Sequence, residues 1–246
     1  MRLDQYMVQA GITRSRTLAV KMINAGHISV NGQTVQKASH KVHEADTVSV
    51  RRSELTEYVS RAGHKLAGAL DAFPRLTVVG KRCLDAGAST GGFTDVLLRR
   101  GASWVAAVDV GHDQLVPEIR NHPDVAVYEG MNVRHMSPED IGGQVDLTVS
   151  DLSFISLTKV LGPLAGATAA GGDLLLMVKP QFEVGPARIG KGGVVTDPAA
   201  RAEAVARVRA SAQAVGLEVL GEETSPLPGQ DGNVEFFLWC RKPLEY

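Results

Sequence analysis

Between residues 61 and 246 the chain alternates short apolar runs with helix-like segments, and this alternation constrains its fold more than any other feature. The runs are rich in Val and Leu and are not interleaved with polar residues, as is typical of strands whose two faces are both covered by helices. A Pro- and Gly-rich turn joins the last two runs and indicates a terminal hairpin. The pattern therefore predicts an α/β fold with a mostly parallel sheet that ends in an antiparallel strand.

The expected elements of this region follow from the same pattern. A helix begins at Arg61, and the strands cover residues 82–85, 104–110, 125–129, 145–151, 174–179, 217–221 and 234–240. The helices between them cover residues 92–100, 112–121, 156–170 and 198–215.

Residues 1–50 have a different pattern, with two short helices followed by short strands. Thr13 is the expected N-cap of the second helix, and Asn31-Gly32 predicts a type I′ hairpin. The expected strands cover residues 27–30, 33–35 and 47–50. Residues 51–60 are polar and charged, which indicates a linker. We therefore expect a small α+β domain over residues 1–50, a linker over 51–60 and a larger domain over 61–246.

The charges are divided unequally along the chain, although the net charge is only −1. Residues 1–43 carry a net charge of +5, whereas residues 44–246 carry −6. Such asymmetry favours a module that binds a polyanion near the N-terminus. Charge alone also permits a solvated face on a small domain, so both interpretations stay open at this point.

Metal-binding, secreted and membrane-spanning proteins are all disfavoured by the sequence. Cys83 and Cys240 lie in apolar runs and form no ligand cluster, so we expect reduced, buried thiols and no metal site. The N-terminus lacks an apolar stretch long enough for a signal peptide, and proline, glycine and aspartate interrupt the longest apolar segment, residues 160–178. We expect a cytoplasmic protein without a membrane partner; a monomer is favoured, although the sequence leaves the oligomeric state open.

Residues 85–94, DAGASTGGFT, follow the first strand of the larger domain and open a helix. Glycines there let the backbone approach a ligand closely, and the helix N-terminus offers free N–H groups. A phosphate-binding P-loop would need a lysine near its end, and the dinucleotide pattern G-x-G-x-x-G has a different spacing. The pattern D-x-G-x-x-x-G-G instead resembles motif I of S-adenosylmethionine-dependent methyltransferases, which implies S-adenosylmethionine as the cofactor.

Further polar residues follow the later strands. Asp109 ends the second strand, where a carboxylate can accept the ribose hydroxyls of the cofactor, but nicotinamide enzymes have an acid there too. Asn132 follows the third strand, in a place where it can lie beside the adenine. In open α/β sheets, ligands bind at the carboxyl ends of the strands. The candidate cofactor-binding residues are Asp85, Gly87, Ser89, Thr90, Gly91, Gly92, Phe93, Asp109, Asn132 and Asp151.

The residues after the fourth strand bear on which atom receives the methyl group. Enzymes that methylate amino groups typically have an Asn/Asp-Pro-Pro-aromatic loop there, whereas this chain has Asp151-Leu-Ser-Phe154. Methylation of cytosine carbon 5 needs a nucleophilic cysteine, usually before proline, and neither Cys83-Leu nor Cys240-Arg fits. Both observations disfavour methylation of a base.

The order Lys65, Asp151, Lys179 and Glu235 resembles the catalytic tetrad of FtsJ-type ribose 2′-O-methyltransferases. A ribose hydroxyl is a poor nucleophile at neutral pH, so a base or a stabilising cation must act in the transition state. Lys179 is the best candidate, either as a neutral base or as an ammonium beside the developing alkoxide. Two cations and two anions make the cluster formally neutral, which limits the cost of burying it.

Several phrases are similar to the TlyA family in particular, namely VSRAGHKL, DAGASTGGFTDVLL, SDLSFISL, VKPQFEVG and GKGGVVTDP. The resemblance implies a Rossmann-like class I methyltransferase sheet behind a small RNA-binding domain, and methylation of cytidine 2′-hydroxyls in ribosomal RNA. Because the chain starts at the first helix and ends soon after the last strand, we favour the large subunit. Two other classes stay open: a non-catalytic RNA-binding assembly factor, and the membrane-active hemolysin that some family names suggest.

The N-terminal residues resemble the RNA-binding domain of small-subunit ribosomal protein S-four. The resemblance lies in the initial Arg-Leu-Asp, the Ser-Arg pair that opens the second helix, and the GHISVNG hairpin. It implies contacts to structured RNA, mostly through phosphates. The Gly-rich residues 182–197 either fold over bound RNA or form a mobile surface loop. The candidate residues for binding ribosomal RNA or an assembled subunit are Arg2, Arg14, Ser15, Arg16, Lys21, Arg188 and Lys191.

Overall fold

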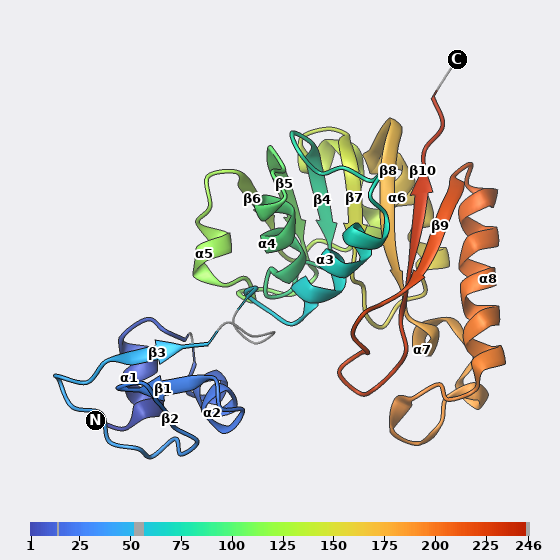
Figure 1. Ribbon diagram of the computed structural model, residues 1–246. Coiled ribbons are helices and arrows are strands. Elements are labelled where there is room, and N and C mark those ends of the chain that lie inside the picture. Colours follow the sequence, from blue (N-terminus) through green and yellow to red (C-terminus); the bar gives the residue numbers. More distant parts are fainter. Residues whose placement is uncertain (14, 52–56, 245–246) are drawn as a thin grey trace. The chain divides into compact units, whose positions relative to one another are not determined.

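The computed structural model describes residues 1–13, 15–51 and 57–244 (Figure 1). The chain forms two compact units, Met1–Tyr58 and Val59–Tyr246, hereafter unit 1 and unit 2. Arg14, one of the candidate RNA-binding residues, lies outside the described residues, as does half of the expected linker, residues 52–56.

Unit 1 has two helices packed on a small antiparallel sheet with the strand order β2-β1-β3. Its elements are α1 (Leu3–Gln9), α2 (Arg16–Asn24), β1 (Ile28–Val30), β2 (Gln33–Thr34) and β3 (Val48–Val50). Asn31 and Gly32 join β1 to β2, both with positive φ, as a type I′ turn requires. Leu3, Met7, Met22 and Ile23 are among the side chains that form its fully enclosed core.

The second helix of unit 1 begins two residues later than the sequence indicated. Ser15 is its N-cap, and its hydroxyl accepts the backbone N–H of Leu18 at 3.2 Å. The expected cap, Thr13, is buried, and its hydroxyl donates to the carbonyl oxygen of Ser15 at 3.3 Å. The prediction of Thr13 as the cap was therefore wrong, because its side chain forms a hydrogen bond before the helix and does not bind an N–H group of the first turn.

Unit 2 contains a seven-stranded sheet with the order β6-β5-β4-β7-β8-β10-β9. The strands are β4 (Arg82–Ala86), β5 (Trp104–Val108), β6 (Val125–Tyr128), β7 (Val145–Ser150), β8 (Thr168–Val178), β9 (Glu218–Thr224) and β10 (Phe236–Arg241). Strands β4 to β8 pair in parallel, and β10 pairs antiparallel with both β8 and β9. This arrangement confirms the predicted α/β fold with an antiparallel last strand.

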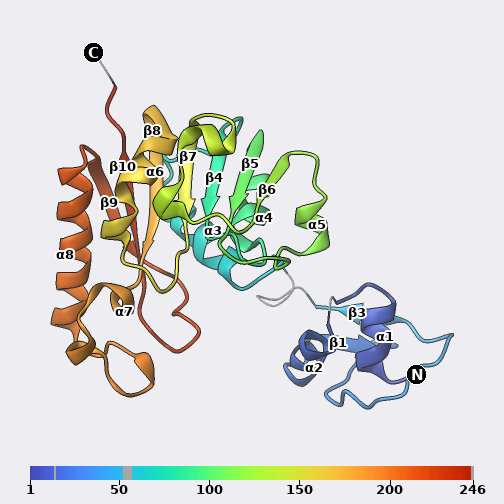
Figure 2. The ribbon, with the colours of Figure 1, turned by 180° about the vertical axis from the view of Figure 1, so that it is seen from behind.

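Helices cover both faces of this sheet (Figures 1 and 2). They are α3 (Ala62–Ala72), α4 (Gly92–Arg99), α5 (Pro117–Arg120), α6 (Leu161–Ala167), α7 (Pro180–Glu183) and α8 (Pro198–Ala214). On one face Phe93 of α4 stacks on Phe237 of β10, and on the other α6 and α8 bury Leu164 and Val208 in the largest apolar cluster. The apolar strands are thus enclosed on both sides, which explains why their sequences lack a polar face.

The largest differences from the expected bounds concern three elements. The helix expected over residues 112–121 is reduced to α5, which begins at Pro117, because proline favours the first position of a helix and disfavours its interior. The helix expected up to residue 170 ends at Ala167, and β8 begins at Thr168 instead of 174. The register of β7 against β8 shifts between Val145 and Leu147. The glycines that interrupt the apolar sequence of β8 lie in the resulting bulge, so the strand continues through them.

This topology gathers the polar residues that follow the strands at one edge of the sheet. Asp109, Asp151 and Lys179 come directly after the parallel strands β5, β7 and β8. Glu235 directly precedes β10, and because β10 is antiparallel, its start lies at the same edge. Phe236 pairs with Val178 in the register, which places Glu235 beside Lys179.

Asp4 joins the two helices of unit 1 through ion pairs. Its side chain is only 1% exposed and lies 2.9 Å from Arg2 Nε and 2.7 Å from Arg16 Nη2. The hydrogen bond from Arg2, followed by the contacts of Arg16, lowers the pKa of Asp4 from 3.8 to about 2. Because the folded pKa is below the ordinary value, the ion pairs stabilise unit 1 above about pH 4 and lose this effect as the pH falls toward 2.

We expect Asp4→Asn to destabilise unit 1 at pH 7 and to remove part of its acid sensitivity between pH 4 and 2. Hydrogen exchange of the α1 and α2 amides in the full chain measures the first effect, and circular dichroism against pH measures the second. Asp71→Asn is the control, because Asp71 pairs with Arg100 at the surface, with 66% and 39% of the side chains exposed. Equal effects of the two substitutions would contradict a structural role for Asp4.

Candidate active site

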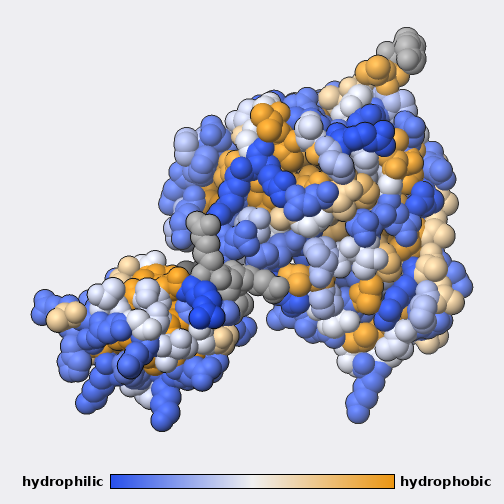
Figure 3. Space-filling model, viewed as in Figure 1, coloured by the Kyte–Doolittle hydropathy of each residue, from blue (hydrophilic) through white to orange (hydrophobic). Residues whose placement is uncertain are grey.

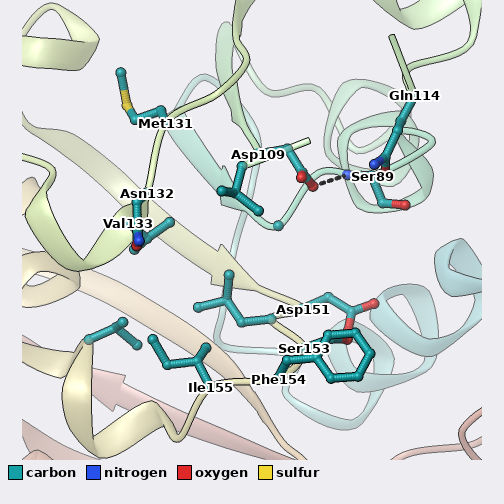
Figure 4. Close-up of a pocket in the computed structure, with 14 residues that line it drawn as sticks. Ser89, Asp109, Gln114, Met131, Asn132, Val133, Asp151, Ser153, Phe154 and Ile155 are labelled. Atoms are coloured by element: carbon teal, nitrogen blue, oxygen red, sulfur yellow. Dashed lines mark hydrogen bonds between the residues drawn. The ribbon is translucent and has the colours of Figure 1, made fainter. Parts of the chain in front are cut away.

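A pocket of about 480 Å³ opens at the carboxyl edge of the sheet in unit 2 (Figure 4). Its walls come from the segments that follow β4, β5, β6 and β7. Five of the ten candidate cofactor-binding residues line it: Gly87, Ser89, Asp109, Asn132 and Asp151. Its volume is in the range of pockets that hold a ligand of nucleoside size.

The loop after β4 passes close to the segment after β7. Gly87 has φ +89°, and a Cβ atom there would lie 2.5 Å from the carbonyl oxygen of Asp151. A larger residue therefore cannot occupy this position without moving one of the two segments. The backbone N–H of Ser89, in the same loop, donates to Asp109 Oδ2 at 2.8 Å.

Two backbone groups orient the carboxylate of Asp109. Besides the N–H of Ser89, the N–H of Gly111 donates to Asp109 Oδ1, also at 2.8 Å. Each carboxylate oxygen can accept a second hydrogen bond, so the side chain remains able to bind hydroxyl groups at the pocket wall. Asp109 is thus a preoriented acceptor on the surface of the pocket.

The other five candidates lie in β4, in the loop that follows it and at the start of α4. Asp85 is fully buried, and its Oδ2 accepts the hydroxyl of Thr94 at 2.7 Å. A Cβ atom on Gly92 would meet Ser60 and Gly63, and Phe93 points toward Phe237 in the core. The structure therefore places these residues, Asp85, Thr90, Gly91, Gly92 and Phe93, outside the set that lines the pocket.

Sequence reasoning missed most of the apolar lining of the pocket. Seven of the nine missed residues lie within four positions of Asp109, Asn132 or Asp151, so closeness to a strand end could have indicated them. The nine residues are Val110, Gln114, Met131, Val133, Leu152, Ser153, Phe154, Ile155 and Val160. The pocket is consequently more apolar than the predicted residue set suggested.

The four candidate catalytic residues lie in two ion pairs. Lys65 Nζ is 2.5 Å from Glu235 Oε2, and Lys179 Nζ is 2.6 Å from Asp151 Oδ1. Lys65, Lys179 and Glu235 are each less than one-tenth exposed. The amide of Gln181, two residues after Lys179, donates to Glu235 Oε1 at 3.4 Å.

Lys179 and Lys65 differ in their relation to the pocket. The partners of Lys179 are Asp151 and the hydroxyl of Ser153, at 2.9 Å, and both of these residues line the pocket. Lys179 itself is not part of the lining and reaches the pocket through these two partners, whereas Lys65 and Glu235 form no hydrogen bond or ion pair with a lining residue among those described. The amino group of Lys179 is therefore held at the pocket, with the Lys65–Glu235 pair behind it.

The candidate RNA-binding residues of unit 1 have different structural roles. Arg2 and Arg16 both bind Asp4, although about half of each side chain remains exposed. Ser15 caps α2, and Lys21 is exposed on the same helix. In the view of Figure 3, hydrophilic side chains cover most of the surface of this unit.

The Gly-rich segment after α7 is tied to the rest of unit 2. Asn233, which is 2% exposed, accepts the N–H of Val195 and donates to the carbonyl oxygen of Gly193, both at 3.0 Å. Arg188 forms ion pairs with Glu203 and Asp197. Lys191 is exposed at the start of a 3₁₀ turn. Of the two candidate RNA contacts in this segment, Lys191 is the more accessible.

Known proteins resemble both units. Residues 58–242 match the family of FtsJ-like methyltransferases, and residues 1–48 match the S4 domain. The 16S/23S rRNA (cytidine-2'-O)-methyltransferase TlyA of Mycobacterium tuberculosis is 50% identical over 240 residues, which cover 98% of this chain and 89% of the relative. The chain belongs to the TlyA family of FtsJ-like methyltransferases.

Other TlyA relatives extend over nearly the whole chain as well. The 23S rRNA (cytidine-2'-O)-methyltransferase TlyA of Campylobacter jejuni is 30% identical, and the alignment covers 98% of this chain and all of the relative. A solved protein from Streptococcus thermophilus, described as a hemolysin, is 37% identical with a TM-score of 0.77, covering 99% of this chain and 88% of that one. Among the described residues, no helix is both long and apolar enough to cross a membrane.

The buried carboxyl group of Asp85 has a raised pKa. Burial, together with the nearby carboxylates of Asp151 and Asp109, raises its pKa from 3.8 to about 7, although the bond from Thr94 opposes the shift. Its Oδ1 has no hydrogen-bond partner among the described residues. Because the folded pKa is raised, this group's contribution to stability is fully present below about pH 4 and is lost as the pH rises through 7.

We expect Asp85→Asn to gain stability relative to the unmodified protein as the pH rises from 5 to 7, by about 2–3 kcal/mol. Urea unfolding at intervals between pH 5 and 8 measures the difference. Thr94→Val should move the pH window upward, because it removes the hydrogen bond that favours the ionised carboxylate. A difference that stays constant over this range would show that Asp85 titrates near its ordinary pKa.

Proposed function

We propose that this TlyA-family protein transfers a methyl group from S-adenosylmethionine to a cytidine ribose 2′-hydroxyl in ribosomal RNA of the large subunit. The observation that carries the proposal is the pair of buried ion pairs, Lys65–Glu235 and Lys179–Asp151, at the edge of the pocket. The names of the Mycobacterium and Campylobacter relatives support the reaction, and 23S rRNA is the target that both names share.

The chemistry of the pocket fits S-adenosylmethionine, which supplies an electrophilic methyl group when bound. Asp109 has free acceptor positions suited to two ribose hydroxyls, and the carboxylate of Asp151 is suited to a cationic group. Apolar side chains such as Val110, Met131 and Val133 offer contact to an aromatic ring. The loop after β4 has no lysine, in keeping with a cofactor that carries no phosphate.

In this proposal Lys179 is the residue that acts on the attacking hydroxyl. Its Nζ lies between Asp151 and Ser153, both of which line the pocket, so it can reach a ribose placed against the cofactor. As a neutral amine it would accept the hydroxyl proton, and as an ammonium it would stabilise the developing negative charge on the oxygen. Lys65 and Glu235 hold the second pair of charges and limit the movement of the site.

Phe154 is the residue best placed to support the target base. It is 91% exposed, has φ +63° and packs on Phe182 with 5.3 Å between ring centroids. This exposed aromatic ring at the pocket wall offers a flat apolar face on which the ring of a ligand can stack. Bases that leave an RNA stack are often held on aromatic side chains, so we include Phe154 as a base platform.

Unit 1 is proposed to bind the RNA itself. Its match to the S4 domain, its positive charge and the exposed Lys21 on α2 support this role. Contacts of this kind would be mainly to phosphates, so they would position the enzyme on ribosomal RNA or a subunit without identifying the target nucleotide.

Lys179→Ala is expected to lower methyl transfer to ribosomal RNA by at least about a hundredfold, because it removes the group that acts on the hydroxyl. Transfer of a labelled methyl group to ribosomal RNA from a strain without the enzyme measures this, and calorimetry should show retained S-adenosylmethionine binding. Lys81→Ala is the control, because Lys81 pairs with Asp173 at the opposite edge of the sheet. Full activity of Lys179→Ala would refute the assignment, and failure of the unmodified protein to bind S-adenosylmethionine would favour the non-catalytic assembly factor.

The double substitution Arg14→Ala with Lys21→Ala should weaken RNA binding and flatten its salt dependence. Each lost phosphate contact reduces the slope of log K against log salt by about 0.7–0.9. Filter binding to ribosomal RNA at several salt concentrations measures the slope. Arg209→Ala, which removes an exposed cation of α8 that pairs with Glu222, is the matched control. An unchanged slope in the double variant would exclude Arg14 and Lys21 from the RNA interface.

A further inference from the structure

The short helix α7 follows Lys179 directly, and its residues contact three different parts of the site. Gln181 donates to Glu235, and Phe182 packs on Phe154. Glu183 binds the segment after β7. The single turn of α7 therefore contacts the Lys65–Glu235 pair, the ring of Phe154 and the segment that forms one wall of the pocket.

Glu183 makes the shortest hydrogen bonds of these three residues. Its side chain is 4% exposed; Oε2 accepts the hydroxyl of Ser156 at 2.6 Å, and Oε1 accepts the N–H of Leu157 at 2.7 Å. Burial raises the pKa of Glu183, whereas the bonds from Ser156 and Leu157 and the charge of Arg207 lower it. A buried carboxylate is costly unless it is hydrogen-bonded, and here both oxygens are.

Glu183 is itself attached to a long helix. Arg207, in α8, donates a hydrogen bond to the backbone carbonyl oxygen of Glu183. Since α8 spans 17 residues and packs on the sheet, it provides a rigid support for α7. A continuous path of hydrogen bonds thus runs from α8 through Glu183 to Ser156 and Leu157.

The segment that Glu183 holds lines the pocket and is strained. Residues 151–155 form one wall, and Phe154 has φ +63°, a left-handed conformation that is unfavourable for a bulky residue. Ser153 is bound to Lys179 and Ser156 to Glu183, so the strained residue lies between two fixed points. Such a conformation persists only where the surroundings over-determine it.

We propose that Glu183 is a positioning residue that clamps residues 153–157, and so sets the pocket wall and Lys179 in one shared geometry. This inference rests on the proposed function, because the geometry in question is that of methyl transfer. It assigns Glu183 no contact with the reacting atoms. Its effect passes through the hydroxyl of Ser156 and the backbone of Leu157.

The chain offers a matched control for a purely structural role. Asp173, in the middle of β8, is 3% exposed and accepts hydrogen bonds from Trp239 and Arg241 at the edge opposite the pocket. Like Glu183, it is a buried, hydrogen-bonded carboxylate. Asp173→Asn should therefore lower stability while leaving the affinity for S-adenosylmethionine unchanged.

The experiment compares Glu183→Ala, Glu183→Gln and Asp173→Asn in the full chain. Calorimetry gives the Kd for S-adenosylmethionine, and labelled methyl transfer to ribosomal RNA gives kcat and KM. Glu183→Ala should raise the Kd and lower kcat, each by about tenfold, because two charge-assisted hydrogen bonds are lost. Glu183→Gln should stay within about threefold of the unmodified protein, since its amide oxygen can accept from Leu157 and its NH₂ can donate to Ser156. Ser156→Ala, which removes one of the two bonds and is less disruptive to folding, should fall between them.

The possible results distinguish failure of the Glu183 clamp from failure of the proposed function. If the unmodified protein binds S-adenosylmethionine and methylates RNA but Glu183→Ala does so equally well, the clamp is refuted and the proposed function stands. If Asp173→Asn raises the Kd as much as Glu183→Ala, the effect is one of general stability and the clamp is again refuted. Loss of activity in Glu183→Gln with normal cofactor affinity would indicate a chemical role and overturn the positioning role. Absence of binding and transfer in the unmodified protein would instead refute the proposed function.

Discussion

The need to bury two lysines and two carboxylates together explains much of the architecture of unit 2. Ion pairs with little exposure are tolerated only when each charge has its partner in place, because the cost of removing a charge from water is large. Glu235 and Lys179 come from different strands, and they are neighbours only because β10 runs antiparallel to β8. A parallel last strand would put the residue before it at the opposite edge, where it could not reach Lys65. The antiparallel strand thus completes the charge balance of the site.

The two edges of the sheet use buried charge differently. At the opposite edge Asp173 is surrounded by Lys81, Arg241 and the indole of Trp239, a network that connects three parts of the fold. At the pocket edge the lysines are paired one to one, and Lys179 keeps a further contact with a residue of the pocket wall. Unit 1 also contains a buried carboxylate that joins parts of the fold. The charges of Arg2 and Arg16 balance that of Asp4, while about half of each arginine side chain stays exposed. An arginine has five N–H donors, so one guanidinium can hold a carboxylate and still bind a phosphate.

Much of the fold could be predicted from the sequence, because strand ends and glycine positions are local signals. The positions of Asp109, Asp151 and Lys179 followed from the alternation of strands and helices, since parallel strands bring their carboxyl ends together. Asp85 shows where this reasoning stops. It lies within β4, one residue before the strand ends, so its side chain faces α4 and binds Thr94. The sequence motif predicts where the loop lies. It does not indicate which residues of the motif line the pocket and which face α4.

Contacts between segments distant in sequence were the least predictable part, and α7 shows why. Nothing in the phrase Lys-Pro-Gln-Phe-Glu indicates that Glu183 will meet Ser156, because that contact depends on where β7 and β8 end relative to each other. The helical conformation of α7 nevertheless determines the directions of its side chains. Pro180 starts a helix directly after the strand, and consecutive helical residues point about 100° apart. A strand would send side chains to two opposite faces only, whereas one helical turn can direct Gln181, Phe182 and Glu183 to three different neighbours. One short helical turn therefore lets three consecutive side chains contact three parts of this site at once.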